Sequence, residues 1–363
     1  MHRIRGSVKE YPWGVVDGLA PWLGDQAGRF AGRPQAELWF GVHPSGPSPL
    51  VDASATLADE LTRDQAPILA KILAAAQPLS VQVHPDAHDA LRMWKHQQIA
   101  GPQILADPHE KAEVLLALEP FQAFVGWRPT ADAAQIVERV DGLALAAAAL
   151  HDHDHRTAIQ MIVERRSDAG AFAQQIPGAV RRTQEAGTLS RSLTADEIAA
   201  YDQAARDFPD DIGVALTPLL DFVTLAPGDA VYLAPGIPHS YVRGIGFEVM
   251  TSSDNVLRLG LTGKPVFVDH ALPILDFSTP AQLMRGSASI TPEGGAFSLV
   301  VIDRDTDLPS GTYRLVVAIE GTCQVRVGEV ASTAAQGEAV AITGEEGVAR
   351  VTTSGRAIAA IAS

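Results

Sequence analysis

Residues 221–250 carry the clearest secondary-structure pattern of the chain, in the run DFVTLAPGDAVYLAPGIPHSYVRGIGFEVM. Two short runs of strand-forming residues flank the turn signal Pro227 and Gly228, and a second turn signal, Pro235 and Gly236, precedes His239. Short strands separated by such turns are typical of antiparallel β structure. A histidine held by a tight turn at the start of a strand often binds metal in jelly rolls, and a structural or capping role for His239 is the alternative.

The regions on either side of this stretch differ in their periodicity. Residues 1–125 hold short apolar segments interrupted by proline and glycine, and residues 269–363 give short β-type runs separated by glycine. Residues 130–207 instead place apolar residues three and four apart, and Thr194 followed by Glu197 has the spacing of a capping box. We therefore predict a mainly β protein with a helical insertion. One jelly roll comprises residues 1–129 and 208–268, an α-helical domain comprises 130–207, and a second jelly roll comprises 269–363.

Net charge and cysteine content exclude several classes of binding site. The chain has 363 residues and a formal net charge of -15, which argues against a nucleic-acid surface because such a surface needs a positive field. The single cysteine, Cys323, excludes an internal disulfide and a multi-cysteine zinc cluster, and its apolar surroundings indicate an inert core thiol. We find no signal peptide and no segment long enough to span a membrane, so we expect a cytoplasmic protein.

Three residues in two further segments have the chemistry of metal ligands. Gln82 and His84 lie two apart in a predicted strand, so their side chains share one face, although packing is the alternative for such a pair. Glu113 opens an apolar run, where it either is solvated at a strand end or supplies an anionic oxygen to a metal.

Two cations stand among apolar neighbours. Arg258 is placed where an unpaired charge is costly to bury, so it either pairs with Asp254 or Glu248 or faces an oxyanion. Lys71 raises the same question, and extension of its ammonium group to the surface is the simpler interpretation.

In their order along the chain, these features resemble the type I phosphomannose isomerases, a family with the cupin fold. The most specific matching runs are QPLSVQVHPD at 77–86 and SDNVLRLGLTGK at 253–264. Further matching runs are YPWG at 11–14, AELWFGVHPSGPS at 36–48, KAEVLLALEPFQAFVGWRP at 111–129 and DIGVALTPLLDFVTLAPGDAVYLAPGIPHSYVRG at 211–244. The resemblance implies that both predicted jelly rolls are of the cupin type.

The resemblance also implies a site. Its metal would be one Zn²⁺ per chain, and its ligands would be Gln82, His84, Glu113 and His239. Arg258 would act in catalysis, and the same pocket would be lined by Lys264, Lys71, Lys111 and Glu248. Trp13 and Glu37 match family positions to which we assign no role.

Two departures from the family pattern affect this site. The family usually has a histidine before the conserved lysine, but this chain has Glu110 before Lys111, with His109 one place earlier. This chain therefore lacks the histidine that the family pattern places directly before the lysine. Gly263 replaces the common proline before Lys264 and is expected to loosen that loop.

The implied reaction interconverts mannose 6-phosphate and fructose 6-phosphate through a cis-enediol. Zinc would act as a Lewis acid, and a fixed arginine would stabilise the enediol oxygens. Lys111 and Glu248 are the candidate bases that move the proton between C1 and C2. Lys264, helped by Lys71 or the Ser80 hydroxyl, is the candidate for binding the phosphate.

Two other functions stay open at this point. One is a cupin metal-dependent oxygenase, which typically has two neighbouring histidines and a carboxylate. The other is a non-catalytic, sugar-binding member of the fold. For the isomerase we expect a sugar phosphate as the small-molecule partner, no nucleic acid or membrane partner, and a monomer or weak homo-oligomer. The histidines at 151, 153 and 155 are expected to lie in a solvated loop, since alternate residues do not share a helix face.

Overall fold

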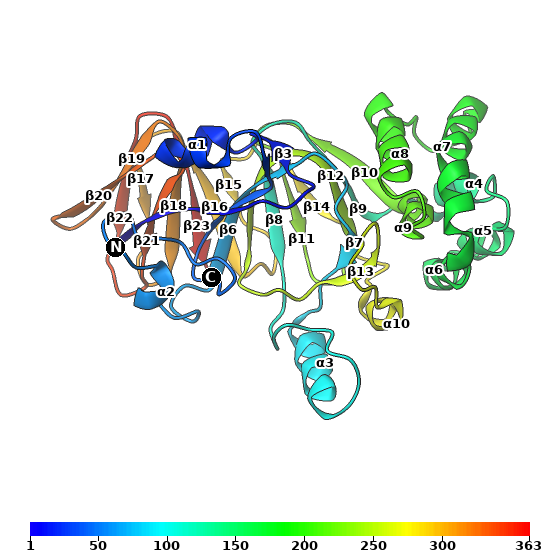
Figure 1. Ribbon diagram of the computed structural model, residues 1–363, viewed down its shortest axis with the longest axis horizontal. Helices are drawn as coiled ribbons and strands as arrows, with labels where there is room; N and C mark the ends of the chain where they lie inside the picture. Colours follow the sequence, from blue (N-terminus) through cyan, green and yellow to red (C-terminus); the bar gives the residue numbers. More distant parts are fainter.

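The structure is a computed structural model that describes all residues, 1–363. Three parts follow one another along its long axis, with the strands of the C-terminal segment at one end, a central β region in the middle and a group of helices at the other end (Figure 1). Both chain termini lie at the C-terminal β end (Figure 1). The predicted mainly β fold of the cupin type with a helical insertion is confirmed.

The central β region is organised by one long strand, β12 (His239–Thr251). Its first residues pair with β7 and β9, and its last residues pair with β6 and β8, so β12 belongs to two layers. The other strands of this region are β2 (Ser7–Lys9), β5 (Glu37–Phe40), β6 (Ile68–Ala75), β7 (Val81–Val83), β8 (Glu113–Ala117), β9 (Phe121–Trp127), β10 (Leu220–Leu225), β11 (Ala230–Leu233), β13 (Leu257–Gly260) and β14 (Gln282–Met284).

The C-terminal β region consists of a six-stranded and a four-stranded antiparallel sheet. The six-stranded sheet is formed by β1 (His2–Arg5), β21 (Glu338–Ile342), β18 (Arg314–Glu320), β23 (Arg356–Ala362), β16 (Phe297–Ile302) and β15 (Ser289–Ile290). The four-stranded sheet is formed by β17 (Thr306–Leu308), β22 (Ala349–Thr353), β19 (Thr322–Val327) and β20 (Val330–Ala335). A separate pair is formed by β3 (Val15–Val16) and β4 (Pro34–Gln35).

Two short strands cross the domain boundaries that the sequence suggests. Strand β1 pairs with β21 of the C-terminal sheet, and β14 pairs with β11 of the central region. Strand-forming runs of three or four residues do not reveal which sheet they join, because pairing partners far apart in sequence leave no local signal. The boundaries at 129, 208 and 269 therefore stay a prediction.

The helical group occupies the predicted insertion. It contains α4 (Thr130–Val137), α5 (Ala144–His151), α6 (His155–Glu164), α7 (Ala169–Ala186) and α8 (Ala195–Asp207). Thr194 caps α8 by accepting a hydrogen bond from the backbone N–H of Glu197. The Glu197 carboxylate is fully buried and pairs with the buried Arg128 that follows β9. This pair joins the helical group to the central strands.

The remaining helical segments are short, apart from α3. They are α1 (Ala27–Phe30), α2 (Leu57–Glu60), α3 (Ala87–Ile99), α9 (Gly213–Leu216) and α10 (Val268–Ala271), with 3-10 turns at Ala20–Trp22, Gly24–Gln26, Arg166–Asp168, Thr217–Leu219 and Leu272–Ile274. No helix combines the length and the apolar character that crossing a membrane requires.

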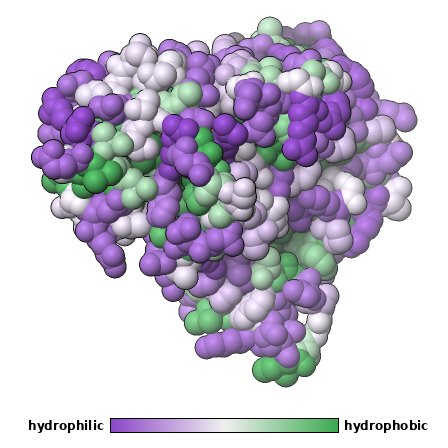
Figure 2. All heavy atoms as spheres, turned by 60° about the vertical axis from the view of Figure 1, so that its left-hand side comes forward, coloured by the Kyte–Doolittle hydropathy of each residue, from purple (hydrophilic) through white to green (hydrophobic).

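Helix α3 projects from the body of the molecule. It forms the bulge at the bottom of Figure 1 and of the rotated space-filling view in Figure 2, where hydrophobic residues gather at the tip. The rest of the face in Figure 2 is largely hydrophilic.

The two faces of the central strands have different environments. Leu38, Ile72 and Phe247 are paired across β5, β6 and β12, and they pack in one core with residues of the C-terminal sheet such as Leu315 and Ile358. Successive residues of a strand point to opposite faces. Their sequence neighbours Trp39, Lys71 and Glu248 therefore face away from this core.

Two glycines let α9 touch β13. A Cβ atom on Gly213 would lie 2.4 Å from the backbone nitrogen of Leu261, and one on Gly260 would lie 2.3 Å from the Gly213 Cα. Both contacts involve backbone, which cannot move aside without displacing β13. Because β13 also carries Arg258, the close approach fixes the strand that presents this cation.

We predict that Gly213→Ala lowers the free energy of unfolding by about 1–3 kcal/mol, because the added methyl group overpacks a backbone contact. Urea unfolding followed by circular dichroism measures the change. Gly28→Ala is the control, since a Cβ there meets nothing within 4 Å. A Gly213→Ala variant as stable as Gly28→Ala would contradict the close contact.

Candidate metal centre and active-site cavity

Strand register brings three sequence-predicted residues into one row. Gln82 of β7 pairs with His239 of β12 on one side and with Arg258 of β13 on the other. Directly paired residues of antiparallel strands have neighbouring side chains on the same face. Gln82 precedes both His239 and Arg258 by more than 150 positions in sequence, yet the sheet places the three residues side by side.

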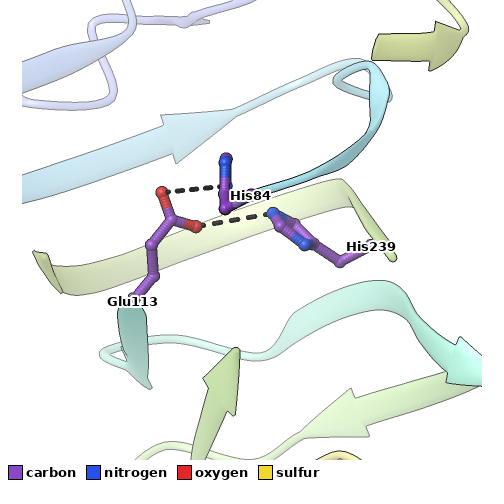
Figure 3. A group of neighbouring side chains, drawn as sticks. All are labelled: His84, Glu113 and His239. Carbon is purple, nitrogen blue, oxygen red and sulfur yellow. Dashed lines mark ion pairs between the residues drawn. The ribbon is translucent and has the colours of Figure 1, made fainter. Parts of the chain in front are cut away.

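His84, Glu113 and His239 form a compact buried group (Figure 3). His84 follows β7, Glu113 begins β8 and His239 begins β12. The carboxylate of Glu113 lies between the two rings, with Oε1 3.5 Å from His84 Nε2 and Oε2 3.4 Å from His239 Nε2. All three side chains are almost inaccessible to solvent.

Hydrogen bonds to backbone carbonyls orient both imidazole rings. His84 Nδ1–H donates to the Asn255 carbonyl at 2.8 Å, and His239 Nδ1–H donates to the Ile237 carbonyl at 3.1 Å. A carbonyl oxygen only accepts, so each Nδ1 carries the proton and each Nε2 presents a lone pair to the centre of the group. Burial and the nearby Lys111 together lower the pKa of His84 to about 4, so this ring is neutral at neutral pH.

Two atoms of this group are buried without a hydrogen-bond partner. They are His84 Nε2 and Glu113 Oε2, which face the centre of the group. A buried acceptor left unsatisfied costs about 1–3 kcal/mol, so such atoms need an explanation. A divalent cation between the rings and the carboxylate would satisfy them, and nitrogen and oxygen donors suit a transition metal.

Gln82 lies beside this group with its amide nitrogen toward the ring of His239. Gln82 Nε2 is 3.1 Å from His239 Nε2, and Gln82 Oε1 accepts a hydrogen bond from Ser80 Oγ at 3.0 Å. A half-turn of the amide would exchange its two ends. The Gln82 oxygen would then point to the same centre as the other three donors.

A cavity of about 580 Å³ opens next to the buried group. Most of the site residues predicted from the sequence line this cavity: Lys71, Ser80, Gln82, Lys111, Glu113, Glu248, Arg258 and Lys264. The two histidines, His84 and His239, are buried and do not line it. Aromatic residues at the rim, Tyr11 and Trp13, stack with ring centroids 5.7 Å apart.

Comparisons with known proteins show which family the chain belongs to. Residues 1–130 match the family model described as phosphomannose isomerase type I, catalytic domain. Mannose-6-phosphate isomerase 1 of Arabidopsis thaliana is 30% identical over 88% of this chain and 82% of its own length. The chain belongs to the type I phosphomannose isomerase family.

Other members of the family extend the similarity over nearly the whole chain. The mannose-6-phosphate isomerase of Escherichia coli is 29% identical, and the match covers 97% of this chain and 99% of that protein. A crystal structure of zinc-bound mannose 6-phosphate isomerase superposes with a TM-score of 0.82 at 25% identity, covering 99% of each chain.

The buried lysines of the cavity are both paired with carboxylates. Lys111 Nζ lies 2.7 Å from Glu113 Oε1. Lys71 Nζ lies 3.1 Å from Glu248 Oε2 and 3.6 Å from Glu37 Oε1. Burial alone would lower the pKa of Lys71, but Glu37 and Glu248 outweigh it and raise this pKa above its ordinary value. The ammonium group is therefore fixed and charged, and it does not extend to the surface.

Arg258 and Lys264 differ from the buried lysines because neither has a carboxylate within ion-pair distance. The alternative in which Arg258 pairs with Asp254 or Glu248 is wrong: Asp254 Oδ2 lies 3.0 Å from His43 Nε2, and Glu248 contacts Lys71. Both free cations line the cavity, and burial together with Arg258 lowers the pKa of Lys264. The cavity thus presents two cations to an anionic ligand.

Sequence reasoning missed Tyr241, gave Asp254 a different partner and left Glu37 without a role. Tyr241 O–H donates to Glu248 Oε1 at 2.9 Å, and Asp254 accepts from the His43 ring. Glu37 accepts from Trp39 Nε1–H at 2.9 Å and faces Lys71. Tyr241 follows His239 by two residues, a spacing that places both on one strand face and would have identified it.

Two sequence expectations about histidines are clarified by the structure. Neither His109 nor Glu110 lines the cavity, so the residue that replaces the family histidine stands outside it. His155 does not lie in a solvated loop: it is buried, with its ring centroid 4.9 Å from that of Trp127 and 5.8 Å from that of Phe277. His151 is exposed but ends helix α5, and His153 is exposed in the turn that follows, as expected.

We predict that Lys71→Met destabilises the fold by about 3–5 kcal/mol, because it leaves Glu37 and Glu248 buried without a counter-charge. Burial already raises the pKa of Glu248, and loss of the ammonium raises it further. A carboxyl with a higher pKa in the folded chain binds more protons there, so stability falls as pH rises. The difference in free energy of unfolding between wild type and Lys71→Met should therefore grow between about pH 5 and about pH 8.

Urea unfolding across this pH range measures the deficit. Lys264→Met is the matched control, since Lys264 is exposed and has no carboxylate partner, and it should change stability by less than about 0.5 kcal/mol. A Lys71→Met deficit that is as small as the control's, or independent of pH, would contradict the pairing.

Proposed function

We propose that the chain interconverts mannose 6-phosphate and fructose 6-phosphate in a zinc-dependent reaction that passes through a cis-enediol. The observation that carries the proposal is the convergence of His84, Glu113 and His239, with their partnerless atoms, beside a cavity that holds two free cations. Membership in the phosphomannose isomerase family supports the choice of substrate.

The donor set fits one Zn²⁺ per chain. Two imidazoles, one carboxylate and the Gln82 amide supply nitrogen and oxygen atoms, the donors that zinc accepts in catalytic sites. When bound, zinc would supply Lewis-acid polarisation of the substrate oxygens. The other group of possible donors, Asp86, His88 and Asp89, lies at the surface at the start of α3, and Asp86 caps that helix.

Lys264 is the favoured phosphate ligand. It lies at the rim of the cavity, near the Tyr11 ring, and no carboxylate neutralises it. Lys71 and Ser80 are less available than the sequence suggested, because Lys71 contacts two carboxylates and the Ser80 hydroxyl donates to Gln82. A phosphate at Lys264 would place the sugar chain along the cavity toward the buried ligands.

Arg258 is the residue proposed to stabilise the negative charge of the enediol oxygens. It neighbours Gln82 in the sheet, so its guanidinium group is presented on the metal side of the cavity. A fixed donor aimed at developing charge in a partly buried site contributes more than it would in water. No carboxylate competes for this guanidinium, which leaves its donors for the substrate.

Glu248 is favoured over Lys111 as the base. Burial raises the pKa of Glu248 and thereby the affinity of its carboxylate for a proton. Lys111 Nζ lies 2.7 Å from Glu113 Oε1, so its side chain is already engaged with a proposed metal ligand. Tyr241 and Lys71 each donate to one Glu248 oxygen and hold the carboxylate in place.

A cupin oxygenase is the alternative that shares the donor types, since two histidines and one carboxylate also bind iron. The free Arg258 and Lys264 favour a phosphorylated substrate instead. A non-catalytic sugar-binding role would not explain why a carboxylate, Glu248, is buried and held in place by Tyr241 and Lys71. Turnover of mannose 6-phosphate by the purified zinc protein, with no oxygen consumed, separates the three functions.

We predict that Glu113→Ala and His239→Ala each release zinc and abolish isomerisation, because each removes a direct ligand. Metal analysis of the purified variants and a mannose 6-phosphate assay measure both effects. Glu248→Gln is the control: it alters a buried carboxylate of the same cavity that is not a proposed ligand, so it should keep zinc. Full activity of either ligand variant without bound metal would exclude the assignment.

We also predict that Arg258→Ala lowers kcat by about 100-fold to 1000-fold while zinc stays bound, because charge stabilisation is lost only in the transition state. Lys264→Ala should instead act mainly on KM for mannose 6-phosphate. Steady-state kinetics of both variants test this division. An Arg258→Ala effect confined to KM would remove Arg258 from the catalytic role.

A further inference from the structure

Asn255 contacts both the proposed ligand His84 and the loop that leads to Glu113. It lies between β12 and β13, and its side chain is fully buried. We propose that Asn255 is a positioning residue that sets the metal affinity of the site. This inference rests on the proposed metal centre and concerns how strongly that centre binds.

The Asn255 carboxamide holds the loop that leads to Glu113. Asn255 Oδ1 accepts from the backbone N–H groups of Ala106 at 2.9 Å and Asp107 at 3.2 Å. Asn255 Nδ2 donates to the carbonyls of Asp107 at 2.8 Å and His109 at 2.7 Å. An amide has two donors and two acceptor positions, so its capacity is fully used on this one loop.

The backbone of the same residue holds a ligand ring. The Asn255 carbonyl accepts from His84 Nδ1–H at 2.8 Å, which fixes the ring so that Nε2 points at Glu113. The Asn255 side chain binds the carbonyl of His109, which lies four positions before Glu113 in the sequence. One buried residue therefore links the orientation of one ligand to the position of the strand that carries another.

Only an asparagine side chain suits this place. Aspartate has the same shape, but its second oxygen would face the carbonyls of Asp107 and His109 and lie near the Asp107 carboxylate, which is 3.3 Å from Asn255 Nδ2. Alanine would leave two backbone N–H groups and two carbonyls without their partner. Either change frees the loop, and through the Asn255 backbone it frees the His84 ring.

The chain offers a matched control on the same loop. Gln97 of α3 accepts from the backbone N–H groups of Ile104 and Leu105, both at 2.9 Å, and donates to the Leu105 carbonyl at 2.8 Å. Like Asn255, Gln97 forms amide hydrogen bonds to the loop backbone, at the residues that directly precede Ala106. Unlike Asn255, it contacts none of the proposed ligands. Gln97→Ala thus loosens the loop without loosening His84.

The experiment measures the zinc affinity of the full chain by competition with a chromophoric chelator. Wild type, Asn255→Ala, Asn255→Asp and Gln97→Ala are compared, and the visible spectrum of the Co²⁺-loaded proteins reports ligand geometry. Asn255→Ala and Asn255→Asp should bind zinc about 10-fold to 100-fold more weakly and show an altered Co²⁺ spectrum. Gln97→Ala should keep the wild-type affinity and spectrum.

Three results would overturn the inference or its foundation. Wild-type affinity in both Asn255 variants would show that Asn255 does not position the ligands. An equal loss in Gln97→Ala would assign the effect to the loop as a whole. Failure of the wild type to bind zinc would instead refute the proposed metal centre itself. If Asn255→Ala does not fold, Asn255→Ser supplies the same comparison with a smaller loss of polar contacts.

Discussion

The Glu113 carboxylate, buried between two imidazole rings and an ammonium group, is the constraint on which the site depends. Such a charge is tolerated in the interior only if opposite charges and donors surround it. Lys111 supplies one partner at 2.7 Å, and Lys111 and the histidines hold the pKa of Glu113 well below its ordinary value, against the effect of burial. Even so, Oε2 keeps no hydrogen-bond partner, which is the strongest physical argument for a cation at this place.

The course of β12 explains how one strand carries both a proposed metal ligand, His239, and the proposed base, Glu248. His239 and Glu248 are nine positions apart and would face opposite sides of a regular strand. The pairing of β12 with β9 shifts between Tyr241 and Arg243, and Gly244 follows with φ of 131°. This irregularity reverses the alternation, so that Glu248 receives the hydrogen bond of Tyr241 inside the cavity. A side chain at Gly244 would collide with the Pro120 carbonyl.

The fold class and most of the charged cavity residues could be predicted from the sequence, because period and turn signals are local and the QVH and DNVLR runs are distinctive. The pairing of the charges could not. Lys71 reads in sequence as a lysine among apolar residues, and only the register of β5, β6 and β12 reveals that Glu37 and Glu248 flank it. Similarly, nothing near Asp254 in sequence indicates that His43 is its partner, which leaves Arg258 free.

Zinc K-edge X-ray absorption spectroscopy of the wild-type chain loaded with one equivalent of metal tests the metal centre most directly. The buried group requires outer-shell scattering from two imidazole rings, nitrogen and oxygen ligands at about 2.0–2.2 Å and no sulfur. A spectrum without imidazole scattering, or with a sulfur ligand, would show that zinc binds elsewhere and that His84, Glu113 and His239 do not form its site.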